Sequence, residues 1–287
     1  MQVKFKAIDY LSIIYFSLIG LLISAFHYKV DYWYFYLIAY FSYICIIVLL
    51  AYLSTRLPEN KVIKFLRLTY PIITFTFVYK SIQGYVLILH NHFLDHHITT
   101  LEKIIFGTNP TLALEKIVSK PLTEFLKFSY FSYYFYVPVP AIILFFKKRY
   151  NELEKFVFTI TFTFYISYIG FVLYPIQGPR YTLAEAYNIK KLSGYIFTPL
   201  QDFIMANGAV RGACMPSSHL AVAWVSLFLI KKFFGKKPFW LIFPFTLAMT
   251  FSIVYNRYHY ITDGVIGLIV GLICFQLCKY IYIENKK

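Results

Sequence analysis

The sequence predicts an all-α polytopic transmembrane helix bundle of about eight spans, and three observations support this. The chain is 59% hydrophobic and only 14% charged over 287 residues, which leaves too little polar surface to cover a soluble globule. Its apolar runs repeatedly approach the roughly 20 residues that cross a bilayer. Basic residues gather in alternate loops, as the positive-inside tendency predicts. A membrane protein therefore accounts for the net charge of +15 without nucleic acid as a partner.

Eight apolar runs define the predicted spans. The basic amino end leads into the first run without a small-x-small cleavage site, so we expect a transmembrane helix there and not a signal peptide. The runs are residues 10–26, 32–54, 71–90, 124–146, 156–174, 216–230, 238–255 and 258–283. They divide into two N-terminal helices with a basic loop (residues 1–69) and a six-helix core that we expect to be catalytic (residues 70–287).

The distribution of cations predicts the topology. Eight spans place both termini on one side, and lysine and arginine are enriched at both termini and in the even-numbered loops. We therefore expect cytoplasmic termini. The exoplasmic or periplasmic side then carries two long loops, residues 91–122 and 181–213. We expect interfacial helices in the first loop, and the second is a candidate lid or substrate selector.

Two histidine-containing segments lie at the outer mouths of predicted helices. They read CMPSSH at residues 214–219 and RYHYITD at residues 257–263. In a helix, the i, i+4 spacing of His259 and Asp263 would place both side chains on one face. A carboxylate that accepts the far ring N–H fixes the imidazole tautomer and stabilises the charge that develops during attack. His259 is therefore a candidate nucleophile towards phosphorus, and Asp263 is its candidate orienting partner.

The first of these segments has the features of an anion cradle. Pro216 fits the first position of a helix, and the free N–H groups after it, with the hydroxyls of Ser217 and Ser218, can bind an anion. His219 would then face the same anion as a candidate general acid.

Two arginines lie on the same predicted side. Arg180 ends the segment QGPR at residues 177–180, where Gly-Pro stops another apolar helix, and Arg257 precedes His259 by two residues. Guanidinium groups bind phosphate oxygens bidentately, so both are candidate phosphate-binding residues.

The three segments resemble the signature elements of the type 2 phosphatidic acid phosphatase superfamily. The pairs and short runs at residues 94–95, 106–110, 122–124 and 130–134 resemble its inositol phosphorylceramide synthase-like branch, so the similarity covers roughly residues 70 to 280. The resemblance implies an enzyme that needs neither a metal nor another cofactor. It also implies a phosphohistidine on His259, with Asp263 as its partner and His219 as the acid.

The sequence departs from the superfamily pattern at two cations. Leu173 stands where the pattern has a lysine, and Ile253 stands where it has an arginine. Arg257 could replace the second cation, and Lys80 and Arg211 are further candidates for a compensating charge or a substrate contact. A phosphodiester carries one negative charge and a phosphomonoester nearly two, so fewer cations favour a phosphodiester substrate.

Three functions remain open at this stage. The first is a phosphotransferase that passes a phosphodiester head group to a lipid hydroxyl, such as that of ceramide or diacylglycerol, in sphingolipid or related lipid metabolism. The second is a lipid phosphate phosphatase that uses water to hydrolyse a phosphomonoester or pyrophosphate lipid. The third is a non-enzymatic transporter or scaffold, which the clustering of polar residues at one surface disfavours. The donor and acceptor lipids are left open.

Some polar residues receive structural interpretations. His92, His96 and His97 invite a zinc hypothesis, but zinc needs three or four converging ligands, and adjacent helical residues face different ways. We therefore expect no metal there and interpret them as solvated interfacial residues. Lys127, near an outer helix end, is expected to snorkel to the surface. The cysteines at positions 45, 214, 274 and 278 give no disulfide framework.

Overall fold

The computed structural model describes residues 3–283, and within them the regular structure is helical throughout. Among these residues, seven segments are long and apolar enough to cross a membrane. They are α1 (Ala7–Ala25), α2 (Trp33–Arg56), α3 (Lys61–Ser81) with its terminal turn to Gly84, α6 and α7 together (Lys120–Phe146), α8 (Tyr150–Leu173), α12 (Lys236–Tyr255) and α13 (Ile261–Cys278). This confirms the predicted fold class, and the chain is an integral membrane protein.

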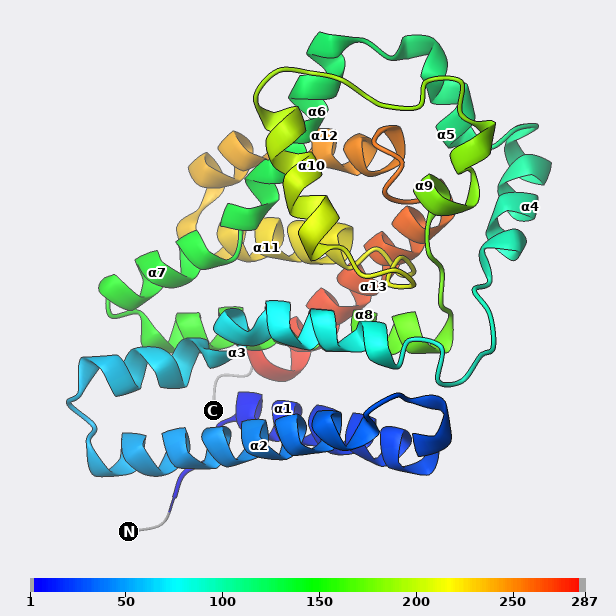
Figure 1. The fold of residues 1–287 in the computed structure, drawn as a ribbon. Coiled ribbons are helices and arrows are strands. Elements are labelled where there is room, and N and C mark those ends of the chain that lie inside the picture. Colours follow the sequence, from blue (N-terminus) through cyan, green and yellow to red (C-terminus); the bar gives the residue numbers. More distant parts are fainter. Residues whose placement is uncertain (1–2, 284–287) are drawn as a thin grey trace.

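Helix α11 (Ser218–Phe234) corresponds to the remaining predicted span and lies at the centre of the bundle (Figure 1). It has 17 residues and packs against α8, α12 and α13. Two glycines of α13 permit the close approach: a Cβ at Gly267 would lie 2.6 Å from the Ser217 carbonyl oxygen, and one at Gly271 would lie 2.8 Å from that of Ala221. The contact fixes the start of α11 against α13.

Helix α3 begins at Lys61, not at Pro71 as the hydropathy predicts. The Asn60 side chain caps it by accepting hydrogen bonds from the N–H groups of residues 62 and 63, and Pro71 lies inside the helix. The predicted division between residues 69 and 70 therefore falls within a continuous helix. Lys80, expected midway along its span, lies instead in the last turn of α3.

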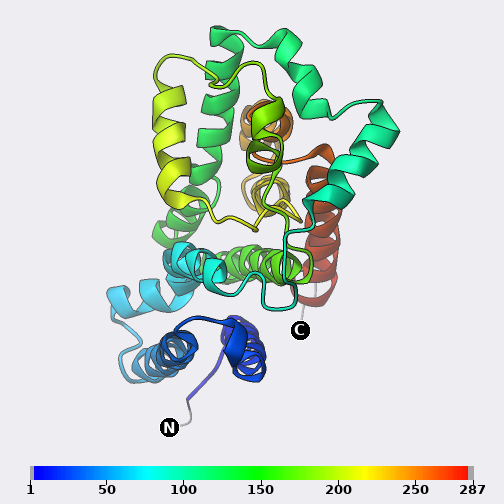
Figure 2. The same ribbon diagram turned by 45° about the vertical axis from the view of Figure 1, so that its right-hand side comes forward.

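An ion pair explains the early start of α3. Arg67, expected in a basic loop, is buried and forms a two-point ion pair with Asp9 of α1. The Tyr70 hydroxyl also donates to Asp9, at 3.1 Å. A buried charge needs a partner and further hydrogen bonds, so the first turns of α3 are recruited into the bundle. Helices α1 and α2 form a hairpin beside α3 and α8 (Figure 2).

The predicted fourth span is interrupted. Helix α6 (Lys120–Ser132) is followed by a 3-10 turn (Tyr133–Phe135) and then by α7 (Pro138–Phe146). Pro138 and Pro140 cannot donate backbone hydrogen bonds, so a continuous helix is disfavoured here. Helix α6 packs against α12 and against α10 (Phe197–Gly208). The interruption brings the aromatic residues of the 3-10 turn against the amino end of α11.

The outer loops fold around the amino ends of α11 and α13 (Figures 1 and 2). They contain α4 (Asp95–Phe106), α5 (Pro110–Ala113), α9 (Pro179–Thr182) and α10. Helix α4 contacts α13, and the Leu94 N–H donates to the Pro175 carbonyl at 2.9 Å. The loops that carry the three predicted segments therefore meet at one end of the bundle.

We predict that this end faces the exoplasmic or periplasmic side. Ser193 is exposed in the outer loop and Lys236 is exposed at the start of α12. In a chain in which Cys45 is replaced by alanine, a membrane-impermeant maleimide should label S193C in intact cells, and K236C only after permeabilisation. Cys214, Cys274 and Cys278 are buried, so the chain without an added cysteine should give only a low background of labelling. The reverse labelling pattern would invert the topology.

Candidate active site

His259 lies in a tight turn between α12 and α13. The turn is closed by hydrogen bonds of 2.9 Å from the N–H groups of Tyr258 and His259 to the Ile253 carbonyl. Because α13 begins at Ile261, the expectation that His259 is itself helical is wrong. The expected contact nevertheless forms, since His259 Nδ1 lies 3.2 Å from Asp263 Oδ2. Both side chains are buried, with exposures of 5% and 0%.

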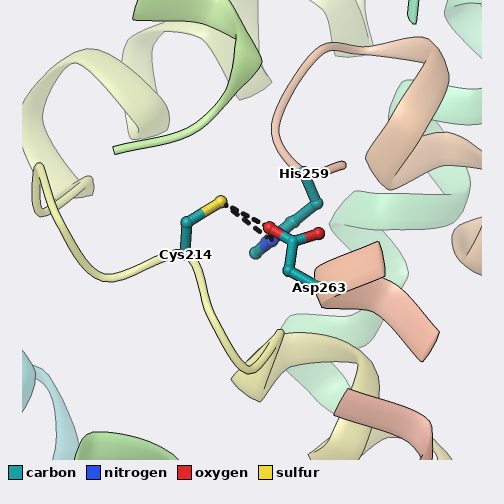
Figure 3. A group of neighbouring side chains, drawn as sticks. All are labelled: Cys214, His259 and Asp263. Atoms are coloured by element: carbon teal, nitrogen blue, oxygen red, sulfur yellow. Dashed lines mark hydrogen bonds and ion pairs between the residues drawn. The ribbon is translucent and has the colours of Figure 1, made fainter. Parts of the chain in front are cut away.

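Cys214 is a third member of this cluster (Figure 3). Its thiol donates to Asp263 Oδ2 at 2.8 Å, and its sulfur lies 3.3 Å from His259 Nδ1. Burial, and then the Asp263 carboxylate, raise the pKa of the Cys214 thiol well above its ordinary value. The thiol therefore stays protonated and serves as a hydrogen-bond donor that fixes the carboxylate. Sequence reasoning did not find this contact.

Ser217 lies on the other side of the imidazole ring. Its hydroxyl oxygen is 3.3 Å from His259 Nε2, and its N–H donates to the Asp263 carbonyl oxygen at 3.0 Å. Helix α11 starts at Ser218 with Ser217 as its N-cap residue, so the prediction of Pro216 at the first helical position is wrong by two residues. Nε2 thus faces a hydroxyl at the mouth of α11, next to the helix N-terminus.

His219 follows in the first turn of α11. Its ring centroid is 6.4 Å from that of His259 and 5.4–6.3 Å from those of three tyrosines, Tyr79, Tyr130 and Tyr133. His219 and Ser218 also border a cavity of about 250 Å³ that has a largely aromatic wall. The wall includes Phe75, Tyr79, Tyr133, Tyr134, Phe164 and Tyr168. The imidazole therefore lies between the cluster around His259 and an apolar space.

The loop that carries Arg180 is held by Asp95. The Asp95 carboxylate accepts hydrogen bonds from the N–H groups of Gln177 at 3.0 Å and Gly178 at 2.9 Å. Gly178 has a φ of +98°, and a Cβ there would lie 3.1 Å from both the Cys214 sulfur and the Tyr258 carbonyl oxygen. The site therefore requires glycine at this position.

Arg180 is available to an anion. Its guanidinium carbon lies 5.8 Å from the Tyr258 ring centroid, and its buried Nε has no hydrogen-bond partner. Within residues 3–283 no acidic side chain forms an ion pair with it.

A second cavity, of about 410 Å³, has a strongly cationic wall. It includes Lys127, Arg180, Lys190, Lys191 and Arg257, together with Asp202 and Tyr258. An anionic group of the size of a lipid head group suits such a space.

Lys127 does not snorkel. Its side chain is 4% exposed, forms an ion pair with Asp202 and donates to the Tyr258 hydroxyl at 2.8 Å. The available sequence signal is its helical spacing, four residues after Thr123 and three before Tyr130, which puts all three side chains on one face of α6.

Arg257 lies at this cavity with its charge already paired. It donates to Glu115 at 2.9 Å, and its guanidinium carbon stacks 3.7 Å from the centroid of Tyr187. Burial alone would raise the pKa of Glu115, but hydrogen bonds from Ile189 and Asn188 and the charge of Arg257 lower it overall. Arg257 thus holds the loop together and also borders the cavity.

The remaining predicted residues lie apart from the two cavities. Lys80 is half-buried in α3, and Arg211 is exposed and donates to the Gln177 side chain at 2.6 Å. The His96 and His97 rings do not face different ways, because their centroids lie 3.9 Å apart. Among the described residues, donor atoms that could converge on a metal ion occur in one group, Cys214, His259 and Asp263. That group excludes the histidines of the outer loop.

Comparison with known protein families identifies the family of the chain. A sequence profile described as PAP2 superfamily matches residues 98–277. The chain belongs to the PAP2 superfamily. Enzymes of the PAP2 superfamily are phosphatases and phosphotransferases that act on phosphoesters, so this chain is an enzyme of that class acting on lipids in the bilayer. The comparisons with curated proteins and with solved structures gave no match.

We predict that Asp95→Asn impairs the site through the Arg180 loop. The amide group cannot accept both backbone hydrogen bonds, and each hydrogen bond to a charged group contributes about 1.5–3 kcal/mol. We expect a lower unfolding temperature in detergent and an activity loss of about tenfold or more, because a displaced binding group is costly. Asp31→Asn, at an exposed position, is the matched control. Wild-type activity in Asp95→Asn would contradict this role.

Proposed function

We propose that the protein transfers a phosphodiester head group from one membrane lipid to the hydroxyl of another through a phosphohistidine on His259. The observation that carries this proposal is the orientation of the His259 ring. Nδ1 contacts the buried Asp263 carboxylate, and Nε2 faces the Ser217 hydroxyl. A histidine nucleophile requires one nitrogen that is oriented by a partner and a second that is directed towards the anion, and here Nε2 is directed towards the amino end of α11.

The two cavities suggest how the donor lipid lies. Its polar group would occupy the cation-lined cavity, with the phosphate beside Arg180 and Tyr258 at the side of the cavity nearest His259. Its leaving alcohol would lie next to His219, where the aromatic cavity can hold an apolar chain. Phosphorus would then lie between His219 and His259, close to the amino end of α11, where backbone N–H groups favour an anion.

In the first step His259 Nε2 attacks phosphorus, and the bond from phosphorus to the lipid oxygen breaks. His219, which is protonated when the anionic phosphate lies beside it, donates its proton to the departing oxygen. The positive charge on the phosphorylated imidazole is stabilised by Asp263 through Nδ1–H. Cys214 holds the same carboxylate through its thiol.

In the second step an acceptor hydroxyl attacks the phosphohistidine. Neutral His219 takes the proton of this hydroxyl while the bond between nitrogen and phosphorus breaks, which regenerates both histidines. The acceptor can enter from the aromatic cavity after the first alcohol has left. A hydroxyl lipid, such as ceramide or diacylglycerol, fits this route.

The charge balance favours a phosphodiester over a phosphomonoester. Arg257 and Lys127 each already form an ion pair, while Arg180 forms none among the described residues. The two positions where the superfamily pattern has cations contribute no charge, because Leu173 (58% exposed) and Ile253 (buried) are both apolar. Counted together with Asp202 and Glu115, the three cations Lys127, Arg180 and Arg257 have a net charge of +1, which matches one negative charge better than two. The resemblance to the inositol phosphorylceramide synthase-like branch points the same way.

We predict that the two histidines have separable roles. His259→Ala should lower turnover by at least about 10⁴-fold and abolish the acid-labile phosphoenzyme. His219→Ala should lower turnover by about 10²–10⁴-fold, with the smallest effect on donors whose leaving group is a good one. Quenched reactions with ³²P-labelled donor measure both. A phosphoenzyme in His259→Ala would refute the covalent mechanism.

The transferase activity is tested by mass spectrometry of products. Purified protein is incubated with candidate phospholipids in EDTA, with and without ceramide or diacylglycerol. We expect head-group transfer that depends on the acceptor and is insensitive to the chelator. Release of inorganic phosphate from a phosphomonoester or pyrophosphate lipid, with no transfer, would support the phosphatase instead. Loss of activity in EDTA that zinc restores would refute metal independence.

A further inference from the structure

Two buried cations in the wall of the cationic cavity, Lys127 and Arg257, each form an ion pair, and the two pairs differ in one respect. Glu115, the partner of Arg257, is 10% exposed and also accepts hydrogen bonds from the backbone of Asn188 and Ile189. The additional hydrogen bonds fix the position of the Glu115 carboxylate, so this pair cannot separate easily. Asp202, the partner of Lys127, is 38% exposed, and its carboxylate contacts only Lys127 among the hydrogen bonds and ion pairs of the described residues.

The Lys127 ammonium group is buried, and its partner is not. Leaving a buried cation unpaired is costly, whereas a half-exposed carboxylate can return to water at little cost. Lys127 can therefore give up Asp202 only when another anion takes the same place. A phosphate oxygen in the cavity is such an anion.

Lys127 contacts the residue that precedes the candidate nucleophile in the chain. Its Nζ donates to the Tyr258 hydroxyl and lies 5.1 Å from the centroid of that ring, while the Arg180 guanidinium carbon lies 5.8 Å from the same centroid. Tyr258 directly precedes His259 in the chain. Two cations from distant elements, α6 and the loop after α8, therefore lie around the same ring, that of Tyr258.

We infer that Lys127 is an anion-binding residue of this site and that Asp202 occupies it in the resting state. The inference rests on the proposed function, and it specifies how the head group binds. The phosphate displaces Asp202 from Lys127, so Lys127 and Arg180 hold the anion together. Since Asp202 belongs to α10, loading the cavity also releases the middle of this helix, while Glu124 still holds its first residues through their backbone N–H groups.

Inorganic phosphate tests the exchange without turnover. Its apparent Kd is measured from the thermal stabilisation of the purified full chain in detergent. Lys127→Met should weaken phosphate binding by roughly tenfold to a hundredfold, the effect of losing one hydrogen bond to a charged group. Asp202→Asn should tighten binding by about two- to fivefold, because a half-exposed ion pair no longer competes.

The opposite signs distinguish exchange from a structural role. If the pair served only to hold α6 to α10, breaking it from either side would have the same effect, and two weakened variants would overturn the inference. Glu185→Gln, at the exposed rim, removes the same charge away from Lys127 and should change binding little. Lys127→Arg should retain most of the affinity, and melting without phosphate verifies that each variant is folded.

A double variant provides the decisive control. In the Lys127→Met background, Asp202→Asn should give no gain, because the competition that it removes acts through Lys127. A gain that persists without Lys127 would mean that Asp202 repels the anion directly, which would overturn the exchange. Because phosphate binding requires no reaction, a failed transferase assay leaves this result intact, and the two hypotheses fail separately.

Discussion

The site depends on four carboxylates that one outer segment supplies to the surrounding loops. Each accepts hydrogen bonds from backbone N–H groups of these loops, and hydrogen bonds to a charged acceptor are among the stronger ones. They are Asp95, bound to residues 177 and 178; Glu102, bound to Thr262 at the start of α13; Glu115, bound to residues 188 and 189; and Glu124, bound to residues 195–198. The segment between α3 and the middle of α6 therefore holds the loops of the candidate site in place.

Helix α10 separates the two cavities of the site. Met205 of this helix and Ala209, directly after its end, border both the cationic and the aromatic cavity. One side suits a charged head group, and the other suits an apolar chain. Helix α10 is tied by Glu124 at its start and by Asp202 further along. A lipid phosphoester has both chemical parts, so the proposed function puts its phosphorus between the two cavities.

Local patterns in the sequence determined the fold class and the contact between His259 and Asp263 at the centre of the candidate site. Hydropathy is a property of each segment alone, so it reveals the spans, although it places the start of α3 too late because the cap at Asn60 and the ion pair of Arg67 are not hydrophobic. The spacing of His259 and Asp263 gives the correct contact even though His259 is not helical, because a tight turn before a helix still directs the ring back over its first turn.

Tertiary structure decided the charge of the site. Lys127 meets Asp202 and Tyr258 across 75 and 131 positions of the chain, and Cys214 meets Asp263 across 49. No local pattern encodes such distances, because they depend on how α6, α10 and the outer loops pack. The sequence by itself therefore determined the membrane bundle and supplied the candidate residues for the reaction. Packing decided which cations are paired, since only the fold determines which carboxylate lies within reach of each.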